Sequence, residues 1–279
     1  MKDITILVPV HDFNDTICEF LGKALKSVDL NIETYKDGKL SVLFVSSLKD
    51  EEKIKSFEKC IGTEHKFTYE IITNDGESDF CSQINFGAEH VKTEHFSILE
   101  FDDEYTPKWF KMANEYYYGN ESISIFLPVN MFHDAEYSNW QYGNTMALSP
   151  SFITANNDDT DDIGIINYDR LEKCSLFNLT GGIFNTKDFI AVGKYKPSIQ
   201  VAFNYELMLR MTKKGLKIMV VPKEGYLHTI GREGCLTSSY MMSMTEEERD
   251  KWFSLAVREC IYDEDRKKDI HSIKAEDVK

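Results

Sequence analysis

The chain has 279 residues, with 32 basic and 47 acidic side chains and a formal net charge of −15. Its hydrophobic fraction of 42% is typical of a folded globular protein with a substantial core and excludes a disordered chain. No stretch approaches the roughly 18 consecutive apolar residues of a membrane-spanning helix, so we expect no membrane insertion. The negative charge disfavours simple electrostatic capture of nucleic acid.

The amino-terminal residues and the cysteines both indicate a cytoplasmic protein, in the host cytoplasm if the chain is viral. Met1–Asp3 is followed directly by an apolar strand, which leaves no room for a signal peptide. The six cysteines are scattered and contain no C-x-x-C pair. That spacing favours reduced thiols over a disulfide framework or a zinc site.

Strands and helices are predicted to alternate through the first hundred residues. The strands are short apolar runs, predicted over residues 4–10, 40–45, 68–73 and 95–101. The helices between them are predicted over residues 16–28, 49–60 and 80–91, the first after an N-cap at Asn14 or Asp15. This order predicts an α/β fold, Rossmann-like, with an open, mostly parallel sheet and helices on both faces. In such sheets ligands bind at the carboxyl ends of the strands.

The second half of the chain is less regular. A strand is predicted over residues 122–129, an irregular segment over 130–175, a helix over 203–214 and a strand over 217–221. A capped amphipathic helix is predicted over 245–262. We therefore expect one domain over 1–244, with a more regular half over 1–104 and a less regular half over 105–244. Residues 245–279 form a carboxy-terminal helix and a charged tail.

The strongest local signal is the acidic turn that follows the strand at 95–101. Glu100 and Asp102 lie two residues apart, so they point the same way if the strand remains extended. Two carboxylates that project together suit Mg²⁺ or Mn²⁺ held beside a phosphate. The alternative is a solvated acidic turn that caps the next helix.

Seven short segments, taken in order, resemble the family 2 glycosyltransferases of the GT-A fold. Residues 6–12 are similar to the family's opening strand and turn, and 85–88 with 99–103 are similar to the region of its aspartate-any-aspartate motif, with Glu100 in the first position. Residues 179–184 with 189–195 resemble the acceptor side, and 205–210 with 213–218 resemble the segment that bears the catalytic base. The resemblance spans about residues 1–230 and implies that the half over 1–104 binds the nucleotide-sugar and that the half over 105–244 holds the acceptor and the catalytic groups.

This resemblance implies an enzyme that transfers a sugar from a nucleoside-diphosphate donor, a UDP-sugar by preference, to a hydroxyl acceptor with inversion. The metal, Mn²⁺ or Mg²⁺, would be held by Asp102, Glu100 and His228, and would neutralise the leaving diphosphate. The donor would contact Pro9, Val10, Asp12, Ser46, Asn74, Asp75, Glu100, Asp102 and Arg232. Asp12 is equally explained as a residue of the turn that enters the first helix.

The acceptor side is predicted at Gly181, Gly182 and Trp140. Trp140 lies in the irregular segment, where an aromatic ring suits a sugar or a nucleobase, or belongs to the loop's own small core. The acceptor itself is not readable, and glycans, proteins and small molecules all remain open. A hydroxymethylated base in phage DNA would need a basic groove, for which the candidates are Lys187, Lys194, Lys196, Arg210, Lys213 and Arg232.

The catalytic base is where the sequence departs from the family. The usual Glu-Asp pair aligns with Phe203 and Asn204, neither of which accepts a proton at neutral pH. Glu206 is the nearby carboxylate and is the predicted base, although an ion pair with Arg210 one turn on explains it equally well. If Glu206 is not the base, Asp134 is a further candidate.

Two other functions fit the same pattern. A nucleotidyltransferase also uses an acidic pair and a metal, but it normally has a glycine-rich basic loop after its first strand, and residues 9–15 contain no Gly, Lys or Arg. A non-catalytic protein that binds sugar nucleotides or glycans would keep the fold without the base, which Asn204 leaves open.

Overall fold

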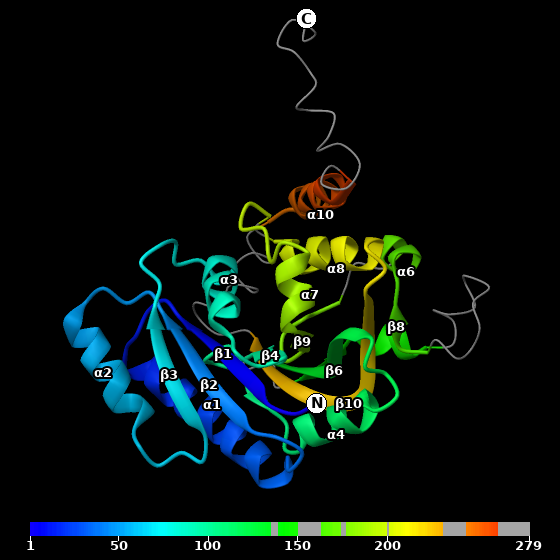
Figure 1. Ribbon diagram of the computed structural model, residues 1–279. Helices are drawn as coiled ribbons and strands as arrows, with labels where there is room; N and C mark the ends of the chain where they lie inside the picture. The colour runs from blue at the N-terminus through cyan, green and yellow to red at the C-terminus, as the bar shows by residue number, and fades with distance from the viewer. Residues whose placement is uncertain (135–138, 150–162, 174–176, 200, 231–243, 262–279) are drawn as a thin grey trace, which may run out of the picture.

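The computed structural model describes residues 1–134, 139–149, 163–173, 177–199, 201–230 and 244–261. These residues form a ten-stranded sheet with helices on both faces (Figure 1). Within the described part of the chain, no helix combines the length and the apolar character needed to cross a membrane.

The first hundred residues form the predicted alternating units. The elements are β1 (Ile4–Val10), α1 (Asp15–Thr34), β2 (Leu40–Ser46), α2 (Glu51–Ile61), β3 (Thr68–Thr73), α3 (Phe80–His90) and β4 (His95–Ile98). Asn14 caps α1 as expected, because its side chain accepts a hydrogen bond from the backbone of Ile17. The α/β fold predicted from the pattern is confirmed, although α1 runs six residues beyond the predicted end at 28.

The second half contains more regular structure than the sequence predicts. Its elements are β5 (Glu104–Tyr105), α4 (Trp109–Tyr117), β6 (Ile123–Asp134), β7 (Trp140–Gly143), the 3₁₀ helix η1 (Thr145–Leu148), β8 (Ile165–Ile166), α6 (Tyr168–Lys173), β9 (Ile183–Asn185), α7 (Thr186–Ala191), α8 (Phe203–Lys213), β10 (Lys217–Ile230) and α10 (Glu246–Ile261). Both β6 and β10 extend well past their predicted ends. They pair with each other in parallel over their whole length, and this long-range pairing stabilises polar stretches that look like loop in the sequence.

The strand order in the sheet is β3-β2-β1-β4-β9-β6-β10-β5, with β7 paired to β6 and β8 paired to β10. The four strands from β3 to β4 are parallel. The short strand β9 is antiparallel to both β4 and β6 and joins the parallel half to the β6–β10 pair. The carboxyl ends of β1, β2, β3 and β4 therefore meet at one edge of the sheet.

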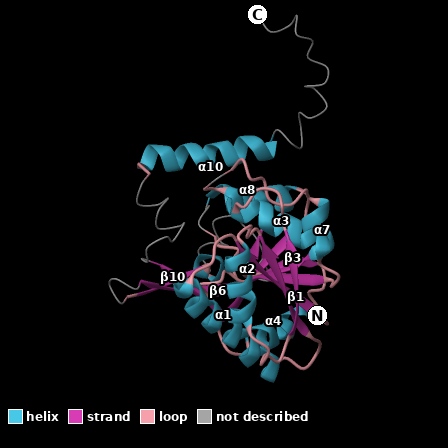
Figure 2. Ribbon diagram, turned by 90° about the vertical axis from the view of Figure 1, so that its left-hand side faces the viewer, coloured by secondary structure: helices cyan, strands magenta, loops and turns pink. Residues whose placement is uncertain are grey.

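Two apolar cores lie on opposite faces of the sheet. Along β1, Ile4, Ile6, Val8 and Val10 belong to one core and Leu7 to the other, as the alternation of a strand requires. The first core packs against α1, α2 and α4, and the second against α3, α7 and α8. Figures 1 and 2 show α10 stacked on α8, farther from the sheet. Ala256 and Cys260 of α10 are buried in that second core, so the helix packs on the domain rather than projecting from it.

Pro9 lies in a central strand, a position where proline is rare because it has no N–H to donate. Along β1, every second residue directs its backbone N–H and C=O toward β4. Leu7 is one of these residues, since its carbonyl accepts the N–H of Leu99. Pro9 faces the same side, but the pairing of β1 with β4 ends at Leu7 and Ile98. The missing N–H therefore removes no ladder hydrogen bond, and the main chain of β4 is free to turn away at this point.

The expectation that all cysteines are reduced is wrong for one pair. Cys18 of α1 and Cys60 of α2 form a disulfide, with their Cα atoms 5.9 Å apart. Their separation of 42 residues carries no motif, and the two cysteines meet only because α1 and α2 pack side by side on one face of the sheet. Cys81 and Cys260 are buried free thiols.

Candidate functional site

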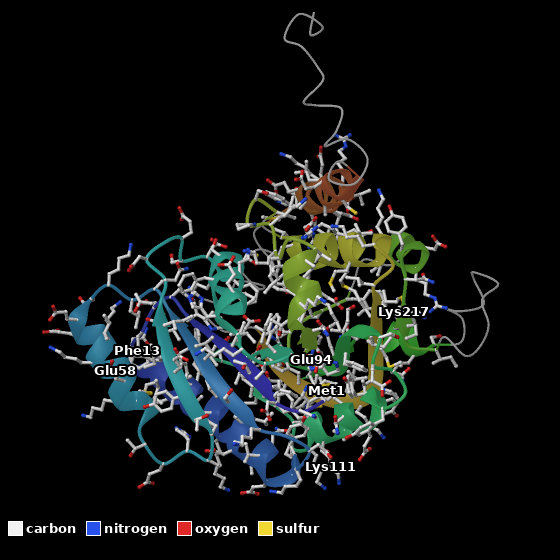
Figure 3. The ribbon with its side chains drawn as sticks, viewed as in Figure 1. Met1, Phe13, Glu58, Glu94, Lys111 and Lys217 are labelled. Carbon is white, nitrogen blue, oxygen red and sulfur yellow. A yellow bond between two sulfur atoms is a disulfide. The ribbon has the colours of Figure 1, made fainter. Side chains whose placement is uncertain are left out.

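The predicted donor residues gather at the carboxyl ends of the parallel strands. The N–H of Ser47 donates to the carbonyl of Val10 at 2.9 Å, and the N–H of Asn74 donates to the carbonyl of Ser46 at 2.8 Å. Figure 3 labels Phe13, which follows β1 at this edge, and Met1 and Glu94, which precede β1 and β4 at the opposite edge. We call the ends of β1 and β2 and the turns after β1, β2 and β3 (residues 10–14, 46–50 and 74–79) the nucleotide crevice, after the role that the sequence predicts for them.

The structure brings most of the predicted donor contacts into this crevice. Val10, Ser46 and Asn74 are buried there, whereas Asp75 is exposed. The Ser46 hydroxyl oxygen accepts the N–H of Leu48 at 3.3 Å, and its own hydrogen remains available to donate. The Asn74 side chain stabilises its own turn, because its oxygen accepts the N–H of Gly76 and its nitrogen donates to the carbonyl of Glu77.

Asp12 is held by a partner that the sequence does not reveal. The Lys53 ammonium in the first turn of α2 donates to the Asp12 carboxylate, which also accepts the N–H of Phe13 at 2.8 Å. The hydrogen bond from Lys53 is the main cause of the lowered pKa of Asp12. Both side chains are about half exposed. Their contact joins the turn after β1 to the first turn of α2 at the nucleotide crevice.

The acidic turn differs from the extended strand end that the sequence predicts. Strand β4 ends at Ile98, and the chain then turns, with the N–H of Asp103 donating to the carbonyl of Glu100 at 3.1 Å. Strand alternation no longer applies beyond this point. As a result Asp103, and not Asp102, points with Glu100 toward His228. The ligand pair of Glu100 and Asp102 stays a prediction, and the grouping of side chains favours Asp103 beside Glu100.

Glu100, Asp103 and His228 place one potential ligand atom each within 4.8 Å of one another. Asp103 is buried, and its carboxylate is hydrogen-bonded to His228 Nδ1 at 2.7 Å and accepts the N–H of Thr229 at 3.2 Å. We call these three residues the acidic cluster. His228, predicted from sequence alone, is brought to this cluster by the long strand β10.

Tyr226 contacts the acidic cluster through a hydrogen bond with the main chain of Glu100. Its hydroxyl oxygen accepts the N–H of Glu100 at 3.1 Å, and burial raises the pKa of the phenol well above its usual value, helped by the charges of Asp103 and Glu100. The phenol therefore stays neutral. Tyr226 also packs on Gly181, where a Cβ atom would lie 2.4 Å from the ring and where φ is +73°.

Glu206 forms the ion pair with Arg210 that the sequence leaves open. The Arg210 Nε and a terminal nitrogen donate to the two Glu206 oxygens at 2.9 and 2.7 Å, and Lys196 lies 3.4 Å from one of them. Both residues of the pair are buried, with Glu206 0% exposed. A general base must reach the acceptor hydroxyl, and this side chain has no surface from which to do so. The base therefore remains unassigned, and the side chain of Asp134 lies outside the described residues.

The predicted acceptor residues do not converge on the acidic cluster. Gly181 and Gly182 are both buried, and they allow close approach of Tyr226 and Leu127 rather than present a surface. Trp140 is 51% exposed and its ring lies 4.7 Å from that of His133. The register places Trp140 opposite His133, and His228 opposite the adjacent residue Phe132. Trp140 and His228 therefore lie on opposite faces of this ribbon.

The basic groove suggested for a DNA acceptor is not supported. Arg210 is buried, Lys194 pairs with Glu89, and Lys196 pairs with Glu206 and Glu259. Side chains that already neutralise carboxylates offer little attraction to phosphates. Arg232, predicted as a diphosphate contact, lies outside the described residues.

One residue of the crevice was not predicted. Gln83 of α3 is fully buried. Its side-chain amide forms hydrogen bonds with all three segments of the crevice, at Val10, Ser47 and Ser78. A glutamine in a helix carries no motif, and its partners lie up to 73 residues away. The nearby motif at Asn85 and Gly87 has a packing role: Asn85 pairs with the main chain of Tyr195, and Gly87 lets α3 approach Val45 and Leu7.

No protein family profile matches the chain, and no curated protein sequence matches it. Solved structures do. S. aureus TarS 1–349 in complex with UDP-GlcNAc superposes with a TM-score of 0.61 at 13% identity, over 99% of this chain and 77% of that one. TarS 1–349 in complex with UDP gives 0.57 at 12% identity, over 99% and 76%. The chain has the GT-A fold. Against the longer S. aureus TarS structure the TM-score is 0.57 at 12% identity, and the chain, 99% covered, spans 46% of that length.

Proposed function

We propose that this chain is a metal-dependent glycosyltransferase, which transfers a sugar from a nucleoside-diphosphate donor, a UDP-sugar by preference, to a hydroxyl group with inversion. The observation that carries the proposal is the position of the acidic cluster, next to the nucleotide crevice, in a GT-A fold. TarS structures of this fold hold UDP and UDP-GlcNAc, which supports a uridine donor.

The chemistry of the acidic cluster fits Mn²⁺ or Mg²⁺. Two carboxylates and one imidazole are hard and borderline donors that suit Mn²⁺, and Mg²⁺ accepts the carboxylates. Opposed ligand atoms on such an ion are about 4.2 Å apart, so a group whose atoms lie within 4.8 Å needs little rearrangement. A bound cation would act as a Lewis acid that neutralises the charge developing on the leaving diphosphate.

The chain's own residues have separate roles in this proposal. The nucleotide crevice binds the nucleoside, and we assign to the Ser46 hydroxyl the donation of a hydrogen bond to a base carbonyl, which its acceptance of the Leu48 N–H supports. Glu100, Asp103 and His228 hold the cation. During transfer the acceptor oxygen forms a bond to the anomeric carbon, the bond from that carbon to the phosphate oxygen breaks, and its electron pair leaves with the nucleoside diphosphate. The acceptor proton must pass to a base that the described side chains do not identify.

A second function is favoured by one observation. Asn204 aligns with the position of the family's base and accepts a hydrogen bond from the Tyr195 hydroxyl at 3.1 Å. Glu206 is already paired with Arg210. A protein that binds sugar nucleotides and does not transfer them would have this arrangement. It would bind the donor with the same cation dependence and would not turn it over.

The two functions are separated by a donor screen. Thermal unfolding is measured with UDP-GlcNAc, UDP-glucose and GDP-mannose, each with Mn²⁺ and with EDTA, and release of nucleoside diphosphate is followed in the same samples. A transferase gives a Mn²⁺-dependent rise in the unfolding midpoint together with slow donor hydrolysis. A binding protein gives the rise alone. No rise with any donor would refute both functions.

A further inference from the structure

We propose that Gln83 is the positioning residue of the nucleotide crevice, holding the ends of β1 and β2 and the turn after β3 at the spacing that a pyrimidine nucleoside diphosphate requires. The inference rests on the proposed function and extends it to a residue outside the motifs.

The side-chain amide of Gln83 joins three separate segments. Its Oε1 accepts the N–H of Val10 at 3.0 Å, and its Nε2 donates to the Ser78 carbonyl at 2.7 Å and to the Ser47 hydroxyl at 3.4 Å. Val10 ends β1, Ser47 follows β2, and Ser78 ends the turn after β3. These are the three segments that form the crevice.

The same amide also orients the Ser47 hydroxyl. Because that oxygen accepts a hydrogen from Gln83, its own hydrogen is directed elsewhere, and the Val10 carbonyl lies 3.5 Å away. Ser47 is thereby held within the protein framework. This leaves Ser46, whose oxygen accepts from Leu48, as the hydroxyl donor of the pair. The pattern suits the carbonyl oxygens of a pyrimidine, which accept hydrogen bonds.

No other residue type reproduces these contacts at this reach. An ionised glutamate accepts from Val10 but cannot donate to the Ser78 carbonyl, and it places a second acceptor against that carbonyl. Leucine has a similar volume and makes none of the three hydrogen bonds, so buried groups lose their partners. Gln83 is 0% exposed, so water does not replace them.

Asn31 provides a matched control. It is also a fully buried amide on a helix, and its Nδ2 donates to the carbonyls of Ser27 and Thr106. It lies on α1 against α4, on the opposite face of the sheet from α3. Asn31→Leu therefore removes a comparable set of buried hydrogen bonds without touching the crevice.

The experiment compares Gln83→Glu, Gln83→Leu and Asn31→Leu with the wild type. UDP binding is measured by titration calorimetry with saturating Mn²⁺, Mn²⁺ binding by paramagnetic resonance, and unfolding by circular dichroism. We expect both Gln83 variants to bind UDP about 10- to 100-fold more weakly, with Mn²⁺ affinity within about threefold of wild type. Asn31→Leu should lose stability and keep its UDP affinity.

Each outcome has a distinct meaning. Equal UDP affinity in wild type and Gln83→Glu overturns the inference and leaves the proposed function standing. A loss of UDP affinity in Asn31→Leu as large as in the Gln83 variants also overturns it, because the effect is then general destabilisation. A wild type that binds no UDP overturns the proposed function and the inference with it. If Gln83→Leu does not fold, the nearly isosteric Gln83→Glu decides.

Discussion

Asp103 and Glu206 are both buried carboxylates, but the charges that surround them differ. Both carboxylate oxygens of Glu206 accept hydrogen bonds from the Arg210 guanidinium, and the Lys196 ammonium pairs with one of them. Asp103 meets a histidine and a backbone N–H, with the carboxylate of Glu100 as the third member of its cluster. A buried charge is costly unless it is paired. Glu206 is neutralised by Arg210 and Lys196, whereas Asp103 lies beside a second carboxylate and an imidazole, a set of donors that suits a divalent cation.

This comparison shows why a carboxylate in the expected segment is not enough to assign a role. Glu206 fits the family's base segment and yet is saturated by its own helix and by the neighbouring turn, where Arg210 also donates to the carbonyls of Val192 and Lys194. The acidic cluster instead brings two carboxylates and one imidazole together within 4.8 Å, with Asp103 bonded to His228 and to a backbone N–H. The charged groups around each side chain distinguish Glu206 from Asp103 better than the position of either residue in a sequence motif does.

The largest expected effect is that of Asp103→Asn. The substitution removes a ligand charge and the acceptor that orients His228, so Mn²⁺ affinity should fall by at least about 100-fold and donor hydrolysis by a similar factor. Titration of Mn²⁺ by paramagnetic resonance and an assay of nucleotide release measure the two effects. Asp102→Asn is the matched comparison and should have the smaller effect. If Asp102→Asn had the larger effect, Asp102 and not Asp103 would be the ligand, as the sequence predicts.

The next effect concerns stability. Arg210→Met leaves Glu206 buried without its principal partner, which should cost about 3–5 kcal/mol in the free energy of unfolding. The double variant Glu206→Met with Arg210→Met removes both charges and should recover most of that loss. Urea unfolding measures both. Glu206→Gln tests the alternative role: if it folds with wild-type stability and loses all turnover, Glu206 is the base after all and the comparison fails.

The smallest expected effect is at the half-exposed pair of Asp12 and Lys53. Lys53→Met should raise the pKa of Asp12 toward its ordinary value, because the hydrogen bond from Lys53 is the main cause of its lowered pKa. A lowered folded-state pKa contributes stability at neutral pH that is lost as the pH falls through that pKa, so wild type and variant should differ above about pH 4 and converge below it. The difference in unfolding midpoint should not exceed about 2 °C. Carboxyl resonances followed against pH give the pKa directly, and an unchanged value would contradict the contact between Lys53 and Asp12.

The sequence predicts the first half of the fold because its information is local. Apolar runs and helical spacing define β1 to β4, and the acidic residues after β4 mark the site. The sequence does not predict the extended ends of β6 and β10, because polar strands there depend on pairing across about 90 residues of chain. The choice between Asp102 and Asp103 depends on one turn, and the contacts of Gln83 and the Cys18–Cys60 disulfide depend on packing between distant segments.

The link between Asp103 and β10 has a consequence for how the molecule is made. Asp103 accepts hydrogen bonds from His228 and Thr229, which are 125 and 126 residues farther along the chain. During synthesis the nucleotide crevice is complete once α3 has emerged, but the acidic cluster has to wait for β10. A nascent or truncated chain that ends before β10 would present the crevice without the cluster. In the proposed function, cation binding would therefore be acquired at the end of assembly, and it would report that the two halves of the sheet have joined.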